Sequence, residues 1–113
     1  MTHTPTSYVS YVLITDAHSL LAKAHALDLA KNHQHLLLIG KPHEGLMEWA
    51  HQLMTYGVEV DFFETDHSDP HSLALLADWI HNSYPVSRFL NLAAIPWMEE
   101  IFEPRPFQEK KVA

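Results

Sequence analysis

Hydrophobic and polar residues alternate along this chain in blocks that predict four strands separated by three helices. Short runs of leucine, β-branched or aromatic residues that end at polar residues or glycine predict the strands. Segments in which apolar residues recur every three or four positions predict the helices. In chain order, the expected elements span residues 8–14, 18–33, 36–39, 46–54, 58–63, 70–82 and 88–92.

Capping residues mark the ends of these helices. Asp16 or Ser19 can cap the first helix, and the pair Asp69-Pro70 places a capping carboxylate and a proline at the start of the third. Gly57 is a stop signal for the second helix. Leu20, Ala24, Leu27 and Lys31 recur at helical spacing along the first helix.

Strands that alternate with helices predict a parallel sheet with helices on both faces. Because crossovers between parallel strands are right-handed, the first two helices lie on one face, and the fourth strand is then added beside the first. The predicted order is 3-2-1-4, an α/β fold of the Rossmann-like three-layer type with three helices. We expect one domain, with a flexible N-terminus over residues 1–7, a core over 8–95 and an aromatic tail over 96–113.

The tail is expected to be irregular but not free, because it carries large apolar residues among proline and glutamate. In the predicted order only the third helix covers the second face of the sheet, and the fourth strand leaves an apolar edge. The tail, a second copy of the chain, or both are expected to cover it. The interface candidates are Phe89, Leu90, Trp97, Ile101, Phe102 and Phe107.

Charge and composition exclude several classes of function. Seven Lys and Arg against fourteen Asp and Glu give a formal charge of -7 with no basic stripe, so nucleic acid is not an expected partner. The chain has no cysteine for disulfides or thiolate sites, and no apolar run that would span a membrane. Its first residues lack the features of a secretion signal, so we expect a cytoplasmic protein. The densest group of potential metal ligands, residues 66–71, spans a strand end and a helix cap and need not converge, so no metal site is expected.

The residues from 8 to 95 resemble the amino-terminal half of a short-chain dehydrogenase/reductase. Residues 15–22 stand where that family has its Thr-Gly-x-x-x-Gly-x-Gly turn, and Asn91 begins a segment that stands where it has Asn-Asn-Ala-Gly. Lys41 matches the basic residue that receives the 2′-phosphate of NADP, and Asp66 matches the aspartate near the adenine. The resemblance implies a dinucleotide at this edge of the sheet, with NADP as the expected cofactor if there is one. The candidate cofactor-binding residues are Thr15, Asp16, Ser19, Lys41, Asp66 and Asn91.

The glycine motif itself is degenerate, because Asp16, Leu20 and Ala22 occupy all three of its glycine positions. Glycines in such a turn allow a tight bend, close approach of the backbone to phosphate, and contact between helix and strand. Leu20 adds bulk where phosphate would pass, and Asp16 adds a negative charge at a helix N-terminus that would otherwise attract an anion. We therefore expect that this turn has lost dinucleotide binding and that no cofactor is bound.

The resemblance also implies that the reaction centre of the family is missing. The family uses a serine and a Tyr-x-x-x-Lys pair for proton transfer in its later half. The nearest imitation here begins at Tyr84, with Arg88 in place of the lysine and Pro85 preventing the helical spacing. No catalytic residue is expected, and we interpret Tyr84 as a turn residue and Asn91 as a residue that hydrogen-bonds within the sheet.

Three functions stay open. The first is a catalytically inactive, truncated domain that acts through protein contact, with self-association as a homo-oligomer as the expected contact. The second is a nucleotide or small-ligand binder that retains the crevice at the carboxyl ends of the first and fourth strands. The third is one half of an enzyme that a partner polypeptide completes.

Overall fold

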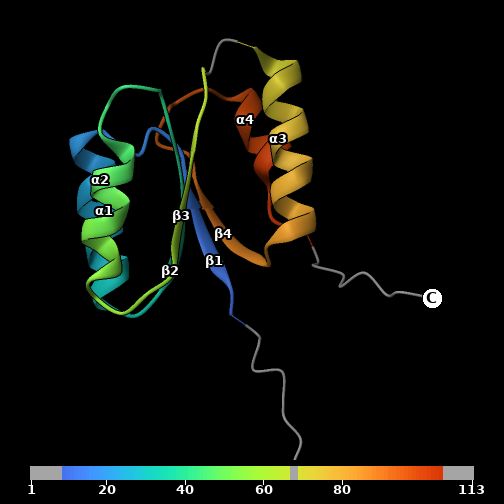
Figure 1. Ribbon diagram of the computed structural model, residues 1–113. Helices are drawn as coiled ribbons and strands as arrows, with labels where there is room; N and C mark the ends of the chain where they lie inside the picture. The colour runs from blue at the N-terminus through green and yellow to red at the C-terminus, as the bar shows by residue number, and fades with distance from the viewer. Residues whose placement is uncertain (1–8, 67–68, 106–113) are drawn as a thin grey trace, which may run out of the picture.

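The computed structural model describes residues 9–66 and 69–105 (Figure 1). Its elements, in chain order, are β1 (Tyr11–Ile14), α1 (Leu20–Lys31), β2 (His35–Gly40), α2 (Leu46–Met54), β3 (Val60–Glu64), α3 (Pro70–Ser83), β4 (Val86–Leu90) and α4 (Trp97–Phe102). The expectations of a flexible N-terminus over residues 1–7 and of Phe107 as an interface residue lie outside the described residues. Among the helices of the described ranges, none is long and apolar enough to cross a bilayer.

The four strands form one parallel sheet in the order β3-β2-β1-β4, which confirms the predicted topology. Leu13 at the centre of β1 pairs with Leu37 on β2 and with Phe89 on β4. Helices α1 and α2 lie against one face of the sheet, and α3 and α4 lie against the other (Figure 1). Side chains that alternate along β1 and β2 therefore enter two separate cores, which is why both strands are continuous apolar runs.

Helix α1 packs on the sheet through a stripe of alanines. Ala22, Ala26 and Ala30 are fully buried, whereas Leu20 and Lys31, two of the residues whose spacing indicated this helix, are exposed. The spacing predicted the helix but not its buried face, because a hydrophobicity pattern favours leucine over alanine. Alanines four residues apart share one helix face, and their small side chains let the helix backbone lie close to the sheet.

A short fourth helix, α4, occupies the segment for which we predicted an irregular tail. Met98 and Phe102 are fully buried in the core beneath α3, and the Phe102 ring lies 5.5 Å from the Phe89 ring on β4. With 6 residues and no side-chain cap, α4 depends on packing for its stability, which periodicity cannot reveal over so short a segment.

The tail thus covers the second face of the sheet within one chain. Phe102 is a core residue rather than an exposed interface residue, because the sheet needs a second cover on this face. Phe89, Trp97 and Ile101 are partly buried around the same core, and Leu90 packs on the opposite one. The interface candidates that the structure describes therefore do not form one exposed surface.

Candidate functional site

The turn from β1 to α1 keeps a glycine-like backbone with an aspartate in it. Asp16 has a φ of 53°, in the left-handed region that only glycine, asparagine and aspartate enter readily. The next residue, Ala17, is buried, and its N–H donates to the Ile39 carbonyl on β2 at 3.0 Å. The Asp16 backbone is therefore held in this conformation by a turn that is anchored to the sheet.

The three residues at the family's glycine positions have three different environments. Asp16 retains the positive φ, and Ala22 is fully buried where α1 meets the sheet. Leu20 is 86% exposed, so its side chain does not pack into the turn. Ser19 caps α1, because its Oγ accepts a hydrogen bond from the Ala22 N–H at 3.1 Å. Of the two predicted capping residues, Ser19 fills that role, which leaves the Asp16 carboxylate for another contact.

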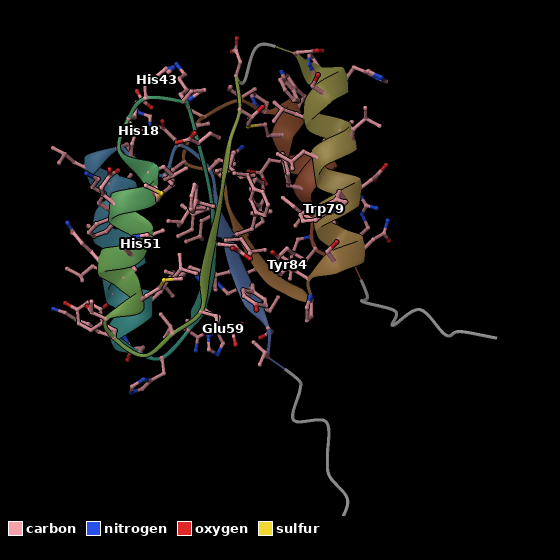
Figure 2. The ribbon with its side chains drawn as sticks, viewed as in Figure 1. His18, His43, His51, Glu59, Trp79 and Tyr84 are labelled. Atoms are coloured by element: carbon pink, nitrogen blue, oxygen red, sulfur yellow. The ribbon has the colours of Figure 1, made fainter. Side chains whose placement is uncertain are left out.

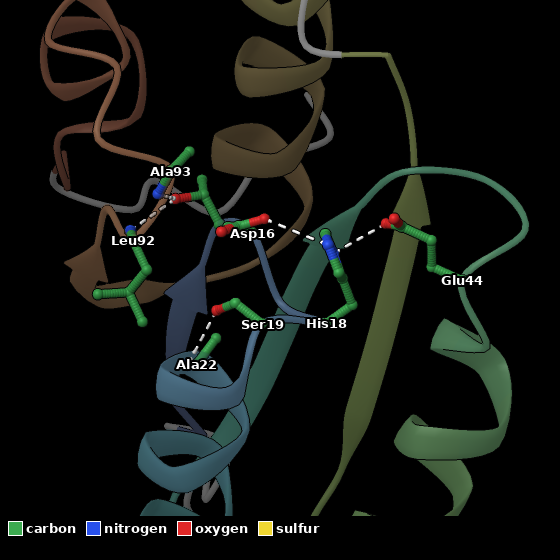
Figure 3. Close-up of polar contacts among 8 residues, drawn as sticks. Asp16, His18, Ser19, Ala22, Glu44, Leu92 and Ala93 are labelled. Atoms are coloured by element: carbon green, nitrogen blue, oxygen red, sulfur yellow. Dashed lines mark hydrogen bonds and ion pairs between the residues drawn. The ribbon is translucent and has the colours of Figure 1, made fainter.

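That contact is with His18, which lies between two carboxylates (Figure 3). Its Nε2 is 3.6 Å from Asp16 Oδ1, and its Nδ1 is 2.9 Å from Glu44 Oε1 in the loop before α2. All three side chains are about one-third exposed. A protonated His18 would neutralise one carboxylate, so the group keeps a net negative charge in either protonation state of the imidazole.

A polar network centred on Thr15 joins the carboxyl ends of β1 and β4. The Thr15 side chain is fully buried, and its Oγ1 accepts hydrogen bonds from the Leu92 N–H at 2.9 Å and the Ala93 N–H at 3.3 Å. The same hydroxyl donates to Asn91 Oδ1 at 3.0 Å, and Asn91 Nδ2 donates to the Ile95 carbonyl at 3.0 Å. Asn91 therefore hydrogen-bonds beyond the ends of the strands, between the residue after β1 and the loop after β4.

Lys41 and Asp66 line one shallow hollow at the ends of β2 and β3. The hollow has a volume of about 360 Å³, and Pro42 and His43 complete its lining. Because β2 and β3 are parallel neighbours, residues that follow their carboxyl ends meet at one edge of the sheet. Sequence separation alone would not place Lys41 and Asp66 in one hollow, but the strand order does.

All six predicted cofactor-binding residues thus lie at the carboxyl edge of the sheet, in three groups. The sequence did not reveal the contact between His18 and Glu44, which joins the loop between β1 and α1 to the loop between β2 and α2. The predicted topology places both loops at this edge, but the chain contains ten histidines and fourteen acidic residues, and no spacing singles out this pair. The interface candidates within the described ranges lie on β4 and α4, and of these Leu90 accepts a hydrogen bond from the Thr15 N–H through its carbonyl.

Comparisons with known proteins and solved structures indicate the class of fold to which this chain belongs. No family model and no curated protein matches the sequence. Among solved structures, the chain is similar to a short-chain dehydrogenase from Sphingobium yanoikuyae in complex with NADPH, with 25% identity and a TM-score of 0.64 over 71% of this chain and 32% of that one. It is also similar to a C2-type ketoreductase from a modular polyketide synthase, with 28% identity and a TM-score of 0.64 over 74% of this chain and 18% of that one. The described chain is a Rossmann-like α/β domain.

Its fold is similar to part of the fold of short-chain dehydrogenases, as the resemblance implied. A short-chain dehydrogenase from Oenococcus oeni PSU-1, at 19% identity, shares the fold with a TM-score of 0.64 over 73% of this chain and 39% of that one. The chain spans less than two-fifths of the length of each of these three structures.

Proposed function

We propose that this domain has the fold of a dinucleotide-binding enzyme but does not hold a dinucleotide at the 15–22 turn, and that it acts without catalysis through contact with another polypeptide. The observation that carries the proposal is the placement of Asp16. Its carboxylate follows β1 at the position where the fold would bring a diphosphate, and it lies 3.6 Å from His18, which also contacts Glu44. The residues present do not fit an anion with two phosphates.

Electrostatics favour this reading over an unusual mode of dinucleotide binding. Asp16 and Glu44 place two carboxylates around one imidazole, so a diphosphate at the turn would meet net negative charge. The helix N-terminus attracts anions only through its free N–H groups, and Ser19 already accepts the bond from the Ala22 N–H. Lys41 lines the hollow beside Asp66 and can compensate only one charge.

Titration calorimetry with NADPH tests the proposal directly. We expect no saturable binding by the native chain below about 1 mM. The double variant Asp16→Gly/Leu20→Gly restores two glycines and removes one carboxylate, and we expect it to bind NADPH at least roughly tenfold more tightly. Asp28→Asn on the outer side of α1 removes the same charge away from the turn and is the matched control. Micromolar binding of NADPH by the native chain, with amide shifts at residues 15–22, would contradict the proposal.

The hollow at Lys41 and Asp66 supports a second candidate function, the binding of an adenosine phosphate without a diphosphate bridge. Lys41 could pair with a phosphate monoester, and the hollow of about 360 Å³ is close to the smallest size of small-molecule sites. Adenosine 2′,5′-bisphosphate is the probe, because it lacks the diphosphate that Asp16 opposes. Binding that Lys41→Ala abolishes, together with no binding of NADPH, would favour this candidate over the first.

A further inference from the structure

Four aromatic rings form a cluster on the α3 side of the sheet, which extends from the amino end of β1 to Phe63 near the carboxyl end of β3. The aromatic cluster consists of Tyr11 on β1, Phe63 on β3, Trp79 on α3 and Tyr84 after α3. Tyr84 contacts the other three rings edge-on, with centroid distances of 5.1 Å to Tyr11, 6.2 Å to Phe63 and 6.0 Å to Trp79. Phe63 and Trp79 lie 5.7 Å apart in the same geometry. Figure 2 shows Trp79 and Tyr84 on the side of α3 that faces the sheet, with Glu59 near the lower end of β3.

The part of the aromatic cluster that α3 contributes is exposed to solvent. Trp79 is 52% exposed although its ring contacts two others, and Leu75, four residues earlier on the same helix face, is 59% exposed. Helix α4 packs beside α3 over β4, whereas over Phe63 on β3 the α3 side of the sheet carries the half-exposed Trp79 ring. Large exposed aromatic and aliphatic side chains that adjoin one another are typical of docking surfaces.

Two carboxylates lie beside these rings. The Tyr11 hydroxyl donates a hydrogen bond to Glu59 Oε1 at 2.6 Å, and the Tyr84 hydroxyl donates one to Asp61. Burial, followed by the hydrogen bond to Glu59, raises the pKa of Tyr11, and burial with the bond to Asp61 raises the pKa of Tyr84 to about 12. Both tyrosines therefore stay neutral at physiological pH. In the described ranges, no lysine or arginine lies within ion-pair distance of either carboxylate.

We propose that the aromatic cluster, with Leu75, Glu59 and Asp61, is a docking surface for a basic and apolar segment of another polypeptide. An arginine of that segment stacks on the exposed Trp79 ring and pairs with Asp61 or Glu59, while an apolar neighbour covers Leu75. Arginine suits this surface because its planar guanidinium stacks on aromatic rings and pairs with carboxylates at the same time. The inference rests on the proposed function in naming the kind of partner for a domain that acts through contact.

The negative charge of this surface favours a basic segment over a second copy of the chain or nucleic acid. A second copy would bring a second pair of carboxylates to the same surface in a twofold contact, on a chain whose formal charge is already -7. Nucleic acid would bring phosphates to those carboxylates. A basic segment is the occupant whose charge complements this surface.

The test uses the full chain and a short synthetic peptide of alternating arginine and leucine, with the indole N–H signals followed by NMR. The chain has three tryptophans, so single Trp→Phe variants assign the Trp79 signal. We expect that signal to shift on titration, Trp79→Ala to weaken binding by roughly tenfold, and Asp61→Asn or Glu59→Gln to weaken it by about threefold each. Trp79 is half exposed, and the amides keep a hydrogen-bond acceptor for each tyrosine, so we expect these variants to fold.

Controls separate a docking surface from general attraction to an acidic protein. Asp28→Asn/Glu48→Gln removes two exposed charges from the opposite layer and is expected to change the affinity less than about twofold. An equal loss in that control, equal binding of a glutamate-leucine peptide, or no shift at Trp79 would overturn the proposal. So would a native homodimer, seen by light scattering, that Trp79→Ala dissociates. The NADPH titration reports on residues 15–22, so a failure of the proposed function and a failure of this surface give different signals.

Discussion

Replacing Thr15 by valine should destabilise the domain far more than the loss of one exposed hydroxyl would. Valine has nearly the same shape, so the packing at this fully buried position is preserved. The change removes the acceptor for the Leu92 and Ala93 N–H groups and the donor to Asn91. Leaving a buried donor without a partner costs about 1–3 kcal/mol, or about 2–6 kcal/mol for two donors. Because the Leu92 and Ala93 N–H groups are only partly buried, we expect the lower part of this range, a loss of about 2–4 kcal/mol in the free energy of unfolding.

Urea unfolding followed by far-UV circular dichroism measures this loss, with Thr15→Ser as the control. Serine keeps the hydroxyl and removes one methyl group, which costs about 1 kcal/mol. The cycle that combines Thr15→Val with Asn91→Ala should show a coupling of roughly 1 kcal/mol, since both changes break the same network. If Thr15→Val unfolds within about 0.5 kcal/mol of Thr15→Ser, the hydroxyl does not hold the β1 and β4 ends together, and the reasoning is refuted.

Three further changes have predictable signs. Ala94 has a φ of 57°, so Ala94→Gly should raise the free energy of unfolding by about 0.5–1 kcal/mol, measured by urea titration; a loss would show that the alanine side chain packs favourably there. Burial lowers the pKa of His81, whose Nδ1–H donates to the Ala77 carbonyl, so stability should be greatest above the ordinary histidine pKa of about 6.5 and fall as the pH drops below it; His81→Phe should flatten that fall between thermal melts at neutral and mildly acidic pH. Burial raises the pKa of Tyr84 to about 12, so stability should decrease as the pH rises above the ordinary tyrosine pKa of about 10, and Tyr84→Phe should reduce the share of tyrosine absorbance that titrates late.

The strand order could be predicted because each of its determinants is local or general. Continuous apolar runs mark β1 and β2, and Gly57 and the Asp69-Pro70 pair end or begin helices as expected. The handedness of crossovers then fixes the arrangement of the strands. What failed was the packing detail: periodicity ranks leucine above alanine, whereas α1 buries alanines because its backbone must lie close to the sheet.

The candidate site could be predicted only in part, for a similar reason. Lys41, Asp66 and Thr15 each follow a strand, and topology brings strand ends together. Side-chain contacts such as that between His18 and Glu44 depend on rotamers and loop conformation, which spacing does not encode. Helix α4 was not predicted because it is stabilised by the burial of Met98 and Phe102 rather than by local helix propensity.

The three roles that glycines have in the family's turn make different physical demands on this chain. The fold can therefore be retained even where we propose that phosphate binding is lost. Close contact of helix and strand requires only a small residue, and Ala22 supplies it. The left-handed turn requires a residue that tolerates positive φ, and Asp16 does so at a cost of about 1 kcal/mol or less. Close approach of a phosphate requires an uncharged residue without a side chain. Aspartate cannot replace glycine in this third role. Stability and phosphate affinity at this turn therefore depend on different properties of the same residue, so Asp16→Gly should change NADPH affinity much more than it changes the free energy of unfolding.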